Sequence, residues 1–251
     1  MQTQIVYEDE AVLVIRKPAG LATESAGIGQ KDVVSELKNY VAKKNPGKMP
    51  YLGIVHRLDQ PVEGLLVFAK TKKAAEDLTA QLGKGTLKKE YLAVVCGKVP
   101  ENTGRLVDYL AKEKGMAVVK NAADAKIKNA ADAKTEKDVD ARVKQAAYPQ
   151  AKKAVLTYTK KAETEKFTLL AVQIETGRFH QIRAQLSHAG FPILGDEKYG
   201  SEESKELSQE KKIRFTALCA ASLSFRHPVT GKTMAFTQTP QNPAFADFVI
   251  E

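Results

Sequence analysis

The chain has 251 residues, of which 43% are hydrophobic and 27% are charged, a balance typical of folded globular domains. These values exclude an intrinsically disordered chain, a collagen-like repeat and a small protein held together by disulfides. The net charge of +9 favours a polyanionic partner such as nucleic acid, although a solubilising role would explain it equally well.

The N-terminal segment and the two cysteines indicate where the protein is located in the cell. The acidic run Glu8–Glu10 stands where a signal peptide needs a positive charge and an apolar core. The sequence contains no apolar run of the length that spans a bilayer. We therefore expect a cytoplasmic protein without membrane contact. Cys96 and Cys219 lie far apart in apolar, strand-like segments, which indicates buried thiols and no metal-ligand spacing.

Hydrophobic periodicity predicts the elements of the first hundred residues. In chain order they are two strands within 4–16, a helix at 31–43, a strand at 64–70, a helix at 72–82 and a strand at 89–96. In the first helix, helical spacing predicts one apolar stripe, formed by Val33, Val34, Leu37 and Val41. Thr71 is the expected N-cap of the second helix.

The second half of the chain continues this irregular alternation. Its expected elements are strands at 116–120 and 153–159 that pair with each other, a strand at 167–174, a helix at 179–189 and a hairpin of 216–225 with 232–238. The alternation lacks the regular repeat of a doubly wound sheet. The sequence predicts the α+β class and one domain over residues 1–251.

Residues 111–153 differ from the rest, because they carry a net charge of +5 and contain the hexapeptide NAADAK twice. Two copies are too few for a solenoid. The segment is expected to be an Ala/Lys-rich insertion or hairpin arm, either a solvated insertion or a cationic arm that contacts nucleic acid.

Two segments carry the polar clusters typical of a functional site. The first, IVHRLDQPVEGLLVFAKT, covers residues 54–71, and the second, ETGRFHQIRAQLSHAG, covers residues 175–190. Polar groups gathered in turns beside apolar elements mark a site more often than a core. A single Asp in such a turn is nevertheless commonly a cap, so the segments alone leave catalysis open.

The ordered motifs resemble those of the RluA-type family of RNA pseudouridine synthases. The matching runs are YEDEAVLVIRKPAGL, HRLD with GLLVFAK, KKEYLAVV, TGRFHQIR, PILGDEKYG and LSFRHPVTG. The resemblance extends from about residue 5 to residue 245 outside the insertion. It implies a long, bent, mainly antiparallel mixed sheet flanked by helices, with an active-site cleft across its middle.

The resemblance also implies the reaction and its residues. Members isomerise uridine in RNA to pseudouridine by breaking the N1–C1′ bond and joining C5 to C1′, with no metal and no organic cofactor. Asp59 matches the family's catalytic aspartate, which attacks the sugar or removes a proton from it. Tyr91 matches the tyrosine that stacks on the target uracil, and Arg183 matches the basic partner of the aspartate.

The RNA contacts implied by the resemblance come from basic residues near these motifs. Arg57 matches the arginine that helps to hold the flipped nucleotide out of its stack. His56 and His180 are either motif scaffolding or RNA contacts, and the remaining RNA-binding candidates are Arg178, Lys88 and Lys89.

The expected partner is a stem-loop of ribosomal or transfer RNA, as in rRNA or tRNA processing, and the expected state is a monomer. Because the pattern begins by residue 5, we expect no S4-type RNA-binding domain before it.

The chain departs from the family pattern at four positions. Val62 and Glu63 replace Thr-Ser, Phe179 replaces a Thr and Cys219 replaces a His. A charge on Glu63 would raise the pKa of Asp59 if the two faced each other. The alternative function is a non-catalytic RNA-binding or RNA-folding module on the same scaffold. A glycoside hydrolase is disfavoured, because the motifs supply one carboxylate and the chain has no Trp.

Overall fold

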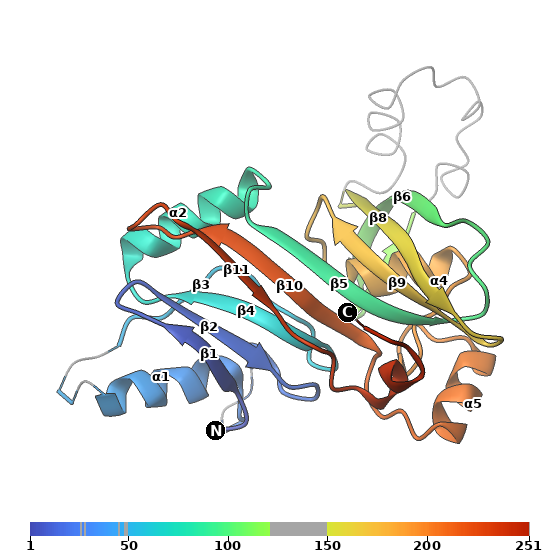
Figure 1. Ribbon diagram of the computed structural model, residues 1–251, viewed down its shortest axis with the longest axis horizontal. Helices are drawn as coiled ribbons and strands as arrows, with labels where there is room; N and C mark the ends of the chain where they lie inside the picture. Colours follow the sequence, from blue (N-terminus) through green and yellow to red (C-terminus); the bar gives the residue numbers. More distant parts are fainter. Residues whose placement is uncertain (26, 28, 45, 48–49, 121–149, 251) are drawn as a thin grey trace, which may run out of the picture. The chain divides into compact units, whose positions relative to one another are not determined.

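The computed structural model describes residues 1–250 except 26, 28, 45, 48–49 and 121–149. The described chain divides into two compact units (Figure 1). Unit 1 comprises Met1–Ala93 and Lys211–Glu251, and unit 2 comprises Val94–Glu210. The single domain expected from the sequence remains a prediction, and the two units are described in turn.

Unit 1 contains a mixed sheet with the strand order β1-β2-β4-β10-β5, in which β3 pairs with β4 and β11 with β10. Its only parallel contact among the described pairs joins β4 to β10. The strands are β1 (Gln4–Glu8), β2 (Val12–Lys17), β3 (Gly53–Ile54), β4 (Glu63–Ala69), β5 (Lys88–Cys96), β10 (Leu218–Arg226) and β11 (Thr233–Thr237). Strand β5 continues past Ala93 into unit 2.

Apolar residues on both faces of β2 and β4 form the core of unit 1. Helix α2 (Lys72–Gly83) begins after the expected N-cap Thr71, whose hydroxyl accepts from the Ala74 N–H at 3.1 Å. Its Leu78 packs on the face that carries Val14 and Val67. Helix α1 (Val33–Lys44) buries the stripe predicted from its sequence, Val33, Val34, Leu37 and Val41. A short 3₁₀ helix, η2 (Pro243–Asp247), follows β11.

Gly64 allows β10 to approach β4 closely. Its φ of +143° lies in a region that other residues rarely adopt. A Cβ built there would lie 2.5 Å from the backbone nitrogen of Ala220. This contact fixes the register Gly64–Ala220, and Ala220 pairs in turn with Tyr91 on β5. Glycine at this position therefore helps to place the predicted active-site tyrosine.

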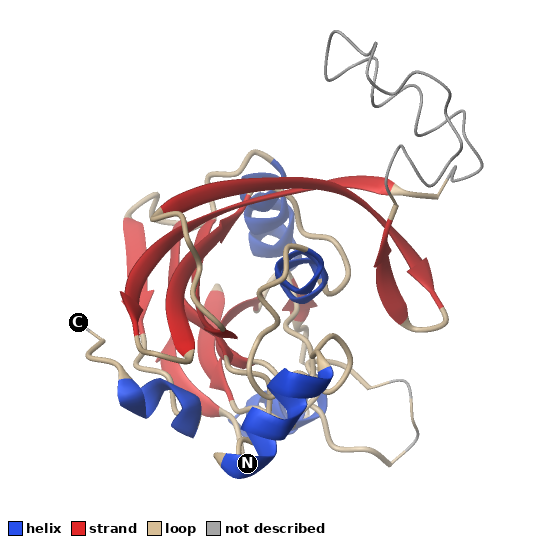
Figure 2. Cartoon of the chain, turned by 90° about the vertical axis from the view of Figure 1, so that its right-hand side faces the viewer, coloured by secondary structure: helices blue, strands red, loops and turns tan. Residues whose placement is uncertain are grey.

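Unit 2 contains an antiparallel sheet with the strand order β9-β8-β6-β7. Its strands are β6 (Thr103–Glu113), β7 (Met116–Val119), β8 (Lys152–Glu163) and β9 (Phe167–Ile174), and its helices are α4 (Gln181–His188) and α5 (Glu202–Glu210). Strand is the commoner regular structure in both units (Figure 2). These interleaved helices and strands confirm the α+β class.

One predicted pairing is wrong. The strands near 116–120 and 153–159 were expected to pair with each other, but both pair with β6, which lies between them. The cause is a two-residue turn at Lys114–Gly115, where both residues have positive φ, as a type I′ hairpin turn requires. Residues 111–119 thus belong to the β6–β7 hairpin, and the NAADAK repeats of the predicted 111–153 arm lie outside the described residues.

Both cysteines are buried free thiols, as predicted. Among the described residues, no helix has the length and apolar character needed to cross a membrane.

Candidate active site

Asp59 lies in the loop between β3 and β4 of unit 1, where it is half-buried. The loop is tied at two points next to it. The carbonyl of Asp59 accepts from the Val62 N–H at 3.1 Å, which closes a turn. The Thr23 hydroxyl bonds both to the carbonyl of Leu58 at 2.8 Å and to its N–H at 3.2 Å. These bonds hold the backbone that presents the Asp59 carboxylate.

Lys17, the last residue of β2, holds the same loop through the carbonyl of Gln60. Its side chain is only 1% exposed, and its Nζ donates to the carbonyls of Pro18, Leu21 and Gln60 at 3.0, 2.6 and 3.1 Å. Burial lowers the pKa of Lys17 to about 7, while the charges of Asp59 and Glu63 act in the opposite direction. The ammonium therefore lies within the electrostatic reach of the predicted catalytic carboxylate.

Tyr91 is buried on β5, and the charge of Asp59 affects the pKa of its phenol. Burial raises the pKa of Tyr91 well above its usual value, and the Asp59 carboxylate raises it further. The phenol is therefore protonated at neutral pH. Two of the three residues that the sequence placed in the active site therefore lie in unit 1, where the charge of one acts on the other.

The other motif residues of unit 1 differ in exposure. His56 is buried, its Nε2 accepts from the Val67 N–H at 3.4 Å, and its Nδ1 has no hydrogen-bond partner among the described residues. Burial and the nearby charge of Lys89 lower the pKa of His56 well below its usual value. This burial fits the scaffolding alternative for His56.

The basic candidates of unit 1 lie nearer the surface. Arg57 is exposed and forms an ion pair with Glu24 at 3.5 Å. Lys88 is exposed and Lys89 is half-buried on β5, where burial lowers the pKa of Lys89 to about 8. All three positions offer positive charge outside the core.

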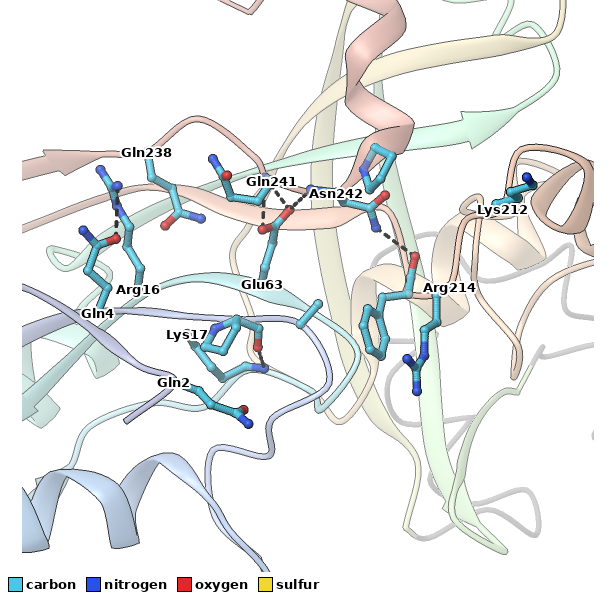
Figure 3. Close-up of a pocket in the computed structure, with 14 residues that line it drawn as sticks. Gln2, Gln4, Arg16, Lys17, Glu63, Lys212, Arg214, Gln238, Gln241 and Asn242 are labelled. Atoms are coloured by element: carbon cyan, nitrogen blue, oxygen red, sulfur yellow. Dashed lines mark hydrogen bonds between the residues drawn. The ribbon is translucent and has the colours of Figure 1, made fainter.

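Glu63, which departs from the family pattern close to Asp59 in the sequence, anchors a backbone segment near the C-terminus. Its carboxylate accepts from the backbone N–H of Gln241 at 3.0 Å and of Asn242 at 2.9 Å (Figure 3). Burial raises the pKa of Glu63, and these two N–H groups and Lys17 oppose that rise. The carboxylate is thus directed at the segment that precedes η2, beside a pocket of about 410 Å³.

Arg183, on α4 of unit 2, is 3% exposed and pairs with an equally buried Asp196. Its Nε and Nη2 donate to the two carboxylate oxygens of Asp196, each at 2.7 Å. The same carboxylate accepts from the N–H groups of Lys198 and Tyr199 at 3.0 and 3.1 Å. This bidentate fork fixes the plane and direction of the guanidinium.

A chain of ring contacts runs outward from Arg183. The guanidinium lies 5.1 Å from the centroid of the Tyr199 ring. The Tyr199 hydroxyl is hydrogen-bonded to His180 Nδ1 at 2.9 Å, and His180 stacks on exposed Phe179 with centroids 3.7 Å apart. His180 has a φ of +50°, a left-handed conformation in which histidine is enriched. Arg178 is exposed, and its Nε donates to the Lys153 carbonyl at 2.9 Å.

The pairing of Arg183 with Asp59 remains a prediction, because the two residues belong to different units. The sequence motifs predicted no role for Lys17, Asp196 or Tyr199. The position of Lys17 at the end of an apolar strand could have indicated a buried cation. The run LGDEKYG was recognised as a family motif, and its polar residues were the signal for Asp196 and Tyr199.

The family described as RNA pseudouridylate synthase matches residues 11–188, a range that includes Asp59, Tyr91 and Arg183. The chain is 32% identical to the uncharacterized RNA pseudouridine synthase YlyB of Bacillus subtilis, over 94% of this chain and 68% of that protein. It is 33% identical to ribosomal large subunit pseudouridine synthase D of Pseudomonas aeruginosa, over 99% and 70%.

Coverage of the relatives varies. The chain is 30% identical to tRNA pseudouridine synthase C of Yersinia pestis, over 96% of this chain and 87% of that protein. It spans only 60% of ribosomal large subunit pseudouridine synthase D of Nitrosomonas europaea. Among solved structures, human RNA pseudouridylate synthase domain containing 4 matches with a TM-score of 0.68 at 22% identity, over 95% of this chain and 89% of that chain. That likeness shows a shared fold.

Proposed function

The chain belongs to the RNA pseudouridylate synthase family, and from that membership we propose that Asp59 is its catalytic carboxylate and that its substrate is a uridine in a stem-loop of ribosomal or transfer RNA. The names of the relatives support both RNA classes. The residue assignment is supported by the motif positions of Asp59 and Tyr91, by their common location in unit 1 and by the effect of the Asp59 charge on the pKa of Tyr91.

Asp59 acts on the ribose of the flipped uridine, either by attack on the sugar or by removal of a proton from it. Its loop is fixed by Thr23 and Lys17, so the carboxylate needs little reorganisation when RNA binds. An ionised carboxylate also stabilises positive character at C1′ as the glycosidic bond breaks.

Tyr91 supplies a buried aromatic ring against which the uracil stacks. Because burial and Asp59 keep its phenol protonated, the hydroxyl serves as a hydrogen-bond donor rather than as a phenolate base. Arg183 supplies the countercharge of Asp59, with its orientation set by Asp196. Arg57 helps to hold the flipped nucleotide out of its stack, and Lys88, Lys89 and Arg178 contact the RNA.

Tritium release tests this proposal. Total RNA labelled at C5 of uridine, from a strain that lacks the enzyme, is incubated with the wild type or with Asp59→Ala. The reaction replaces the C5 hydrogen, so the wild type should release tritium and the variant should not. Both proteins must unfold at similar temperatures and bind the RNA. Release by Asp59→Ala would overturn the assignment of Asp59, and binding without release by the wild type would favour a non-catalytic module.

The proposal extends to cytoplasmic action as a monomer without a metal or an organic cofactor. Activity should then be unchanged after dialysis against a strong chelator. The active species should elute at the mass of one chain on size exclusion. Activity that is lost with the chelator and restored by a divalent ion would contradict the metal-independent mechanism.

A further inference from the structure

An exposed aromatic ring in unit 2 has no place in the chemistry described above. Phe179 is 40% exposed, and it stands where the family pattern has Thr. Its ring lies against the imidazole of His180, with an interplanar angle of 21°. The ring stands in a motif between two residues that can bind RNA, Arg178 and His180.

Cations surround this ring. The Lys112 ammonium lies 4.6 Å from the ring centroid, a cation–π distance. Beside the ring is a hollow of about 550 Å³, whose nine lining residues include Lys112, Lys152 and Arg178 and no carboxylate. Lys112, Lys152 and Arg178 are all exposed. An aromatic ring among cations is the combination by which proteins bind single-stranded nucleic acid.

The ring is held in a fixed orientation. His180, on which it stacks, is bonded to the Tyr199 hydroxyl, and that hydroxyl also accepts from the Ala117 N–H at 2.6 Å. The Tyr199 ring in turn lies beside the guanidinium of Arg183. A base that stacks on Phe179 therefore contacts a preorganised surface that is continuous with the predicted catalytic arginine.

We propose that Phe179, Lys112, Lys152 and Arg178, here called the Phe179 platform, bind an unpaired nucleotide of the substrate RNA outside the catalytic pocket. The base stacks on Phe179. The Lys112 ammonium moves from the ring to a phosphate, and Lys152 and Arg178 contact the neighbouring phosphates. The proposal rests on the proposed function only in taking RNA as the ligand. It makes Phe179 a determinant of RNA choice.

The first test measures binding of a fluorescein-labelled oligouridine RNA of about twelve nucleotides. Phe179→Thr, which restores the residue of the family pattern, should weaken binding by about 5- to 150-fold, the range for loss of one base–aromatic stack. Tyr51→Thr is the matched control, because Tyr51 is 39% exposed but lies in unit 1. It should change binding less than about twofold.

Salt dependence separates stacking from charge. Lys112→Ala and Lys152→Ala should each reduce the slope of log Kd against log salt by about 0.7, the value for one phosphate contact in a single strand. Phe179→Thr should leave that slope unchanged. Lys232→Ala, an exposed lysine of unit 1, controls for general charge loss. Equal slope changes in all three lysine variants would mean that the hollow is not a phosphate site.

A fluorescence readout uses the absence of tryptophan from the chain. Phe179→Trp should retain RNA binding, and its emission should be quenched when the oligonucleotide stacks on it. Tyr51→Trp should not be quenched. Unchanged binding in Phe179→Thr together with unquenched Phe179→Trp would overturn the platform. If the RNA quenches Phe179→Trp but the wild type releases no tritium, the proposed function fails and the platform stands. If the wild type releases tritium but Phe179→Trp is not quenched and Phe179→Thr binds normally, the platform fails and the proposed function stands.

Discussion

The two units hold buried charge in different ways. In unit 1, the Lys17 ammonium is surrounded by backbone carbonyls and its pKa falls to about 7. In unit 2, the Arg183 guanidinium is equally buried, but it is matched by the Asp196 carboxylate in a two-bond fork. An arginine keeps its charge at any accessible pH, whereas a lysine in a desolvated site titrates. Unit 1 should therefore respond to pH, and unit 2 should respond to loss of a partner.

Removal of the Asp196 carboxylate should give the largest effect on stability. Asp196→Ala leaves the Arg183 charge buried without its partner, which typically costs about 3–5 kcal/mol. Urea unfolding measures the loss. The matched control is Asp247→Ala, which breaks an exposed ion pair with Lys211 at 2.8 Å and should cost at most about 1 kcal/mol. Similar losses in the two variants would show that the buried fork is not a distinctive feature of unit 2.

The pH dependence of stability should identify Lys17. Its pKa is about 7 in the folded protein and 10.5 as the unperturbed value. Between these values the unfolded chain binds more protons, so the free energy of unfolding should rise from pH 7 to about 10.5. The total rise should be on the order of a few kcal/mol. Below pH 7 both states are protonated, so the burial penalty is then fully present.

Lys17→Met keeps the length of the side chain and removes its charge. The variant should abolish the rise in stability that begins near pH 7 and reduce the rise above pH 8, where Lys89, with a pKa of about 8, also contributes. Urea unfolding at each pH measures both parts. Lys232→Met, at an exposed position, should leave the rise in place. An unchanged pH profile in Lys17→Met would show that Lys17 is not desolvated as its contacts indicate.

Replacement of Glu63 should give a smaller and more local effect. Glu63→Ser restores the residue of the family pattern and removes the acceptor of the Gln241 and Asn242 N–H groups. The loss should be about 1–3 kcal/mol, the cost of hydrogen bonds to a charged group. Hydrogen exchange should accelerate at these two amides. Unchanged exchange there would contradict the role of Glu63 as an anchor of the C-terminal segment.

The elements that the sequence predicted correctly are those with local signals. The Thr71 cap and the stripe Val33–Val41 are read from spacing of three or four residues, and both are found as expected. The predicted pairing of β7 with β8 is wrong, because the two-residue Lys114–Gly115 turn pairs β7 with β6. A Lys-Gly pair is a weaker turn signal than Asn-Gly or Asp-Gly, so the sequence did not predict β6 as the partner of both strands.

The sequence predicted the motif residues of the site, but not the residues that hold them in position. Asp59, Tyr91 and Arg183 stand at motif positions, and the first two lie in unit 1. Asp196 and Lys17 act through burial and directed hydrogen bonds, which depend on tertiary packing rather than on sequence spacing. The direction of the Glu63 carboxylate was likewise unreadable, since its partners lie 178 and 179 residues away.

The most direct test of the central claim is a single-turnover assay of Asp59→Asn at saturating RNA. The asparagine keeps the size of the side chain and removes its charge. The account predicts that the rate of pseudouridine formation falls by at least about 10²–10⁴-fold, the range for loss of a positioned acid–base group, while the Kd for RNA changes less than about threefold. A rate close to that of the wild type would contradict the claim that Asp59 performs the chemistry.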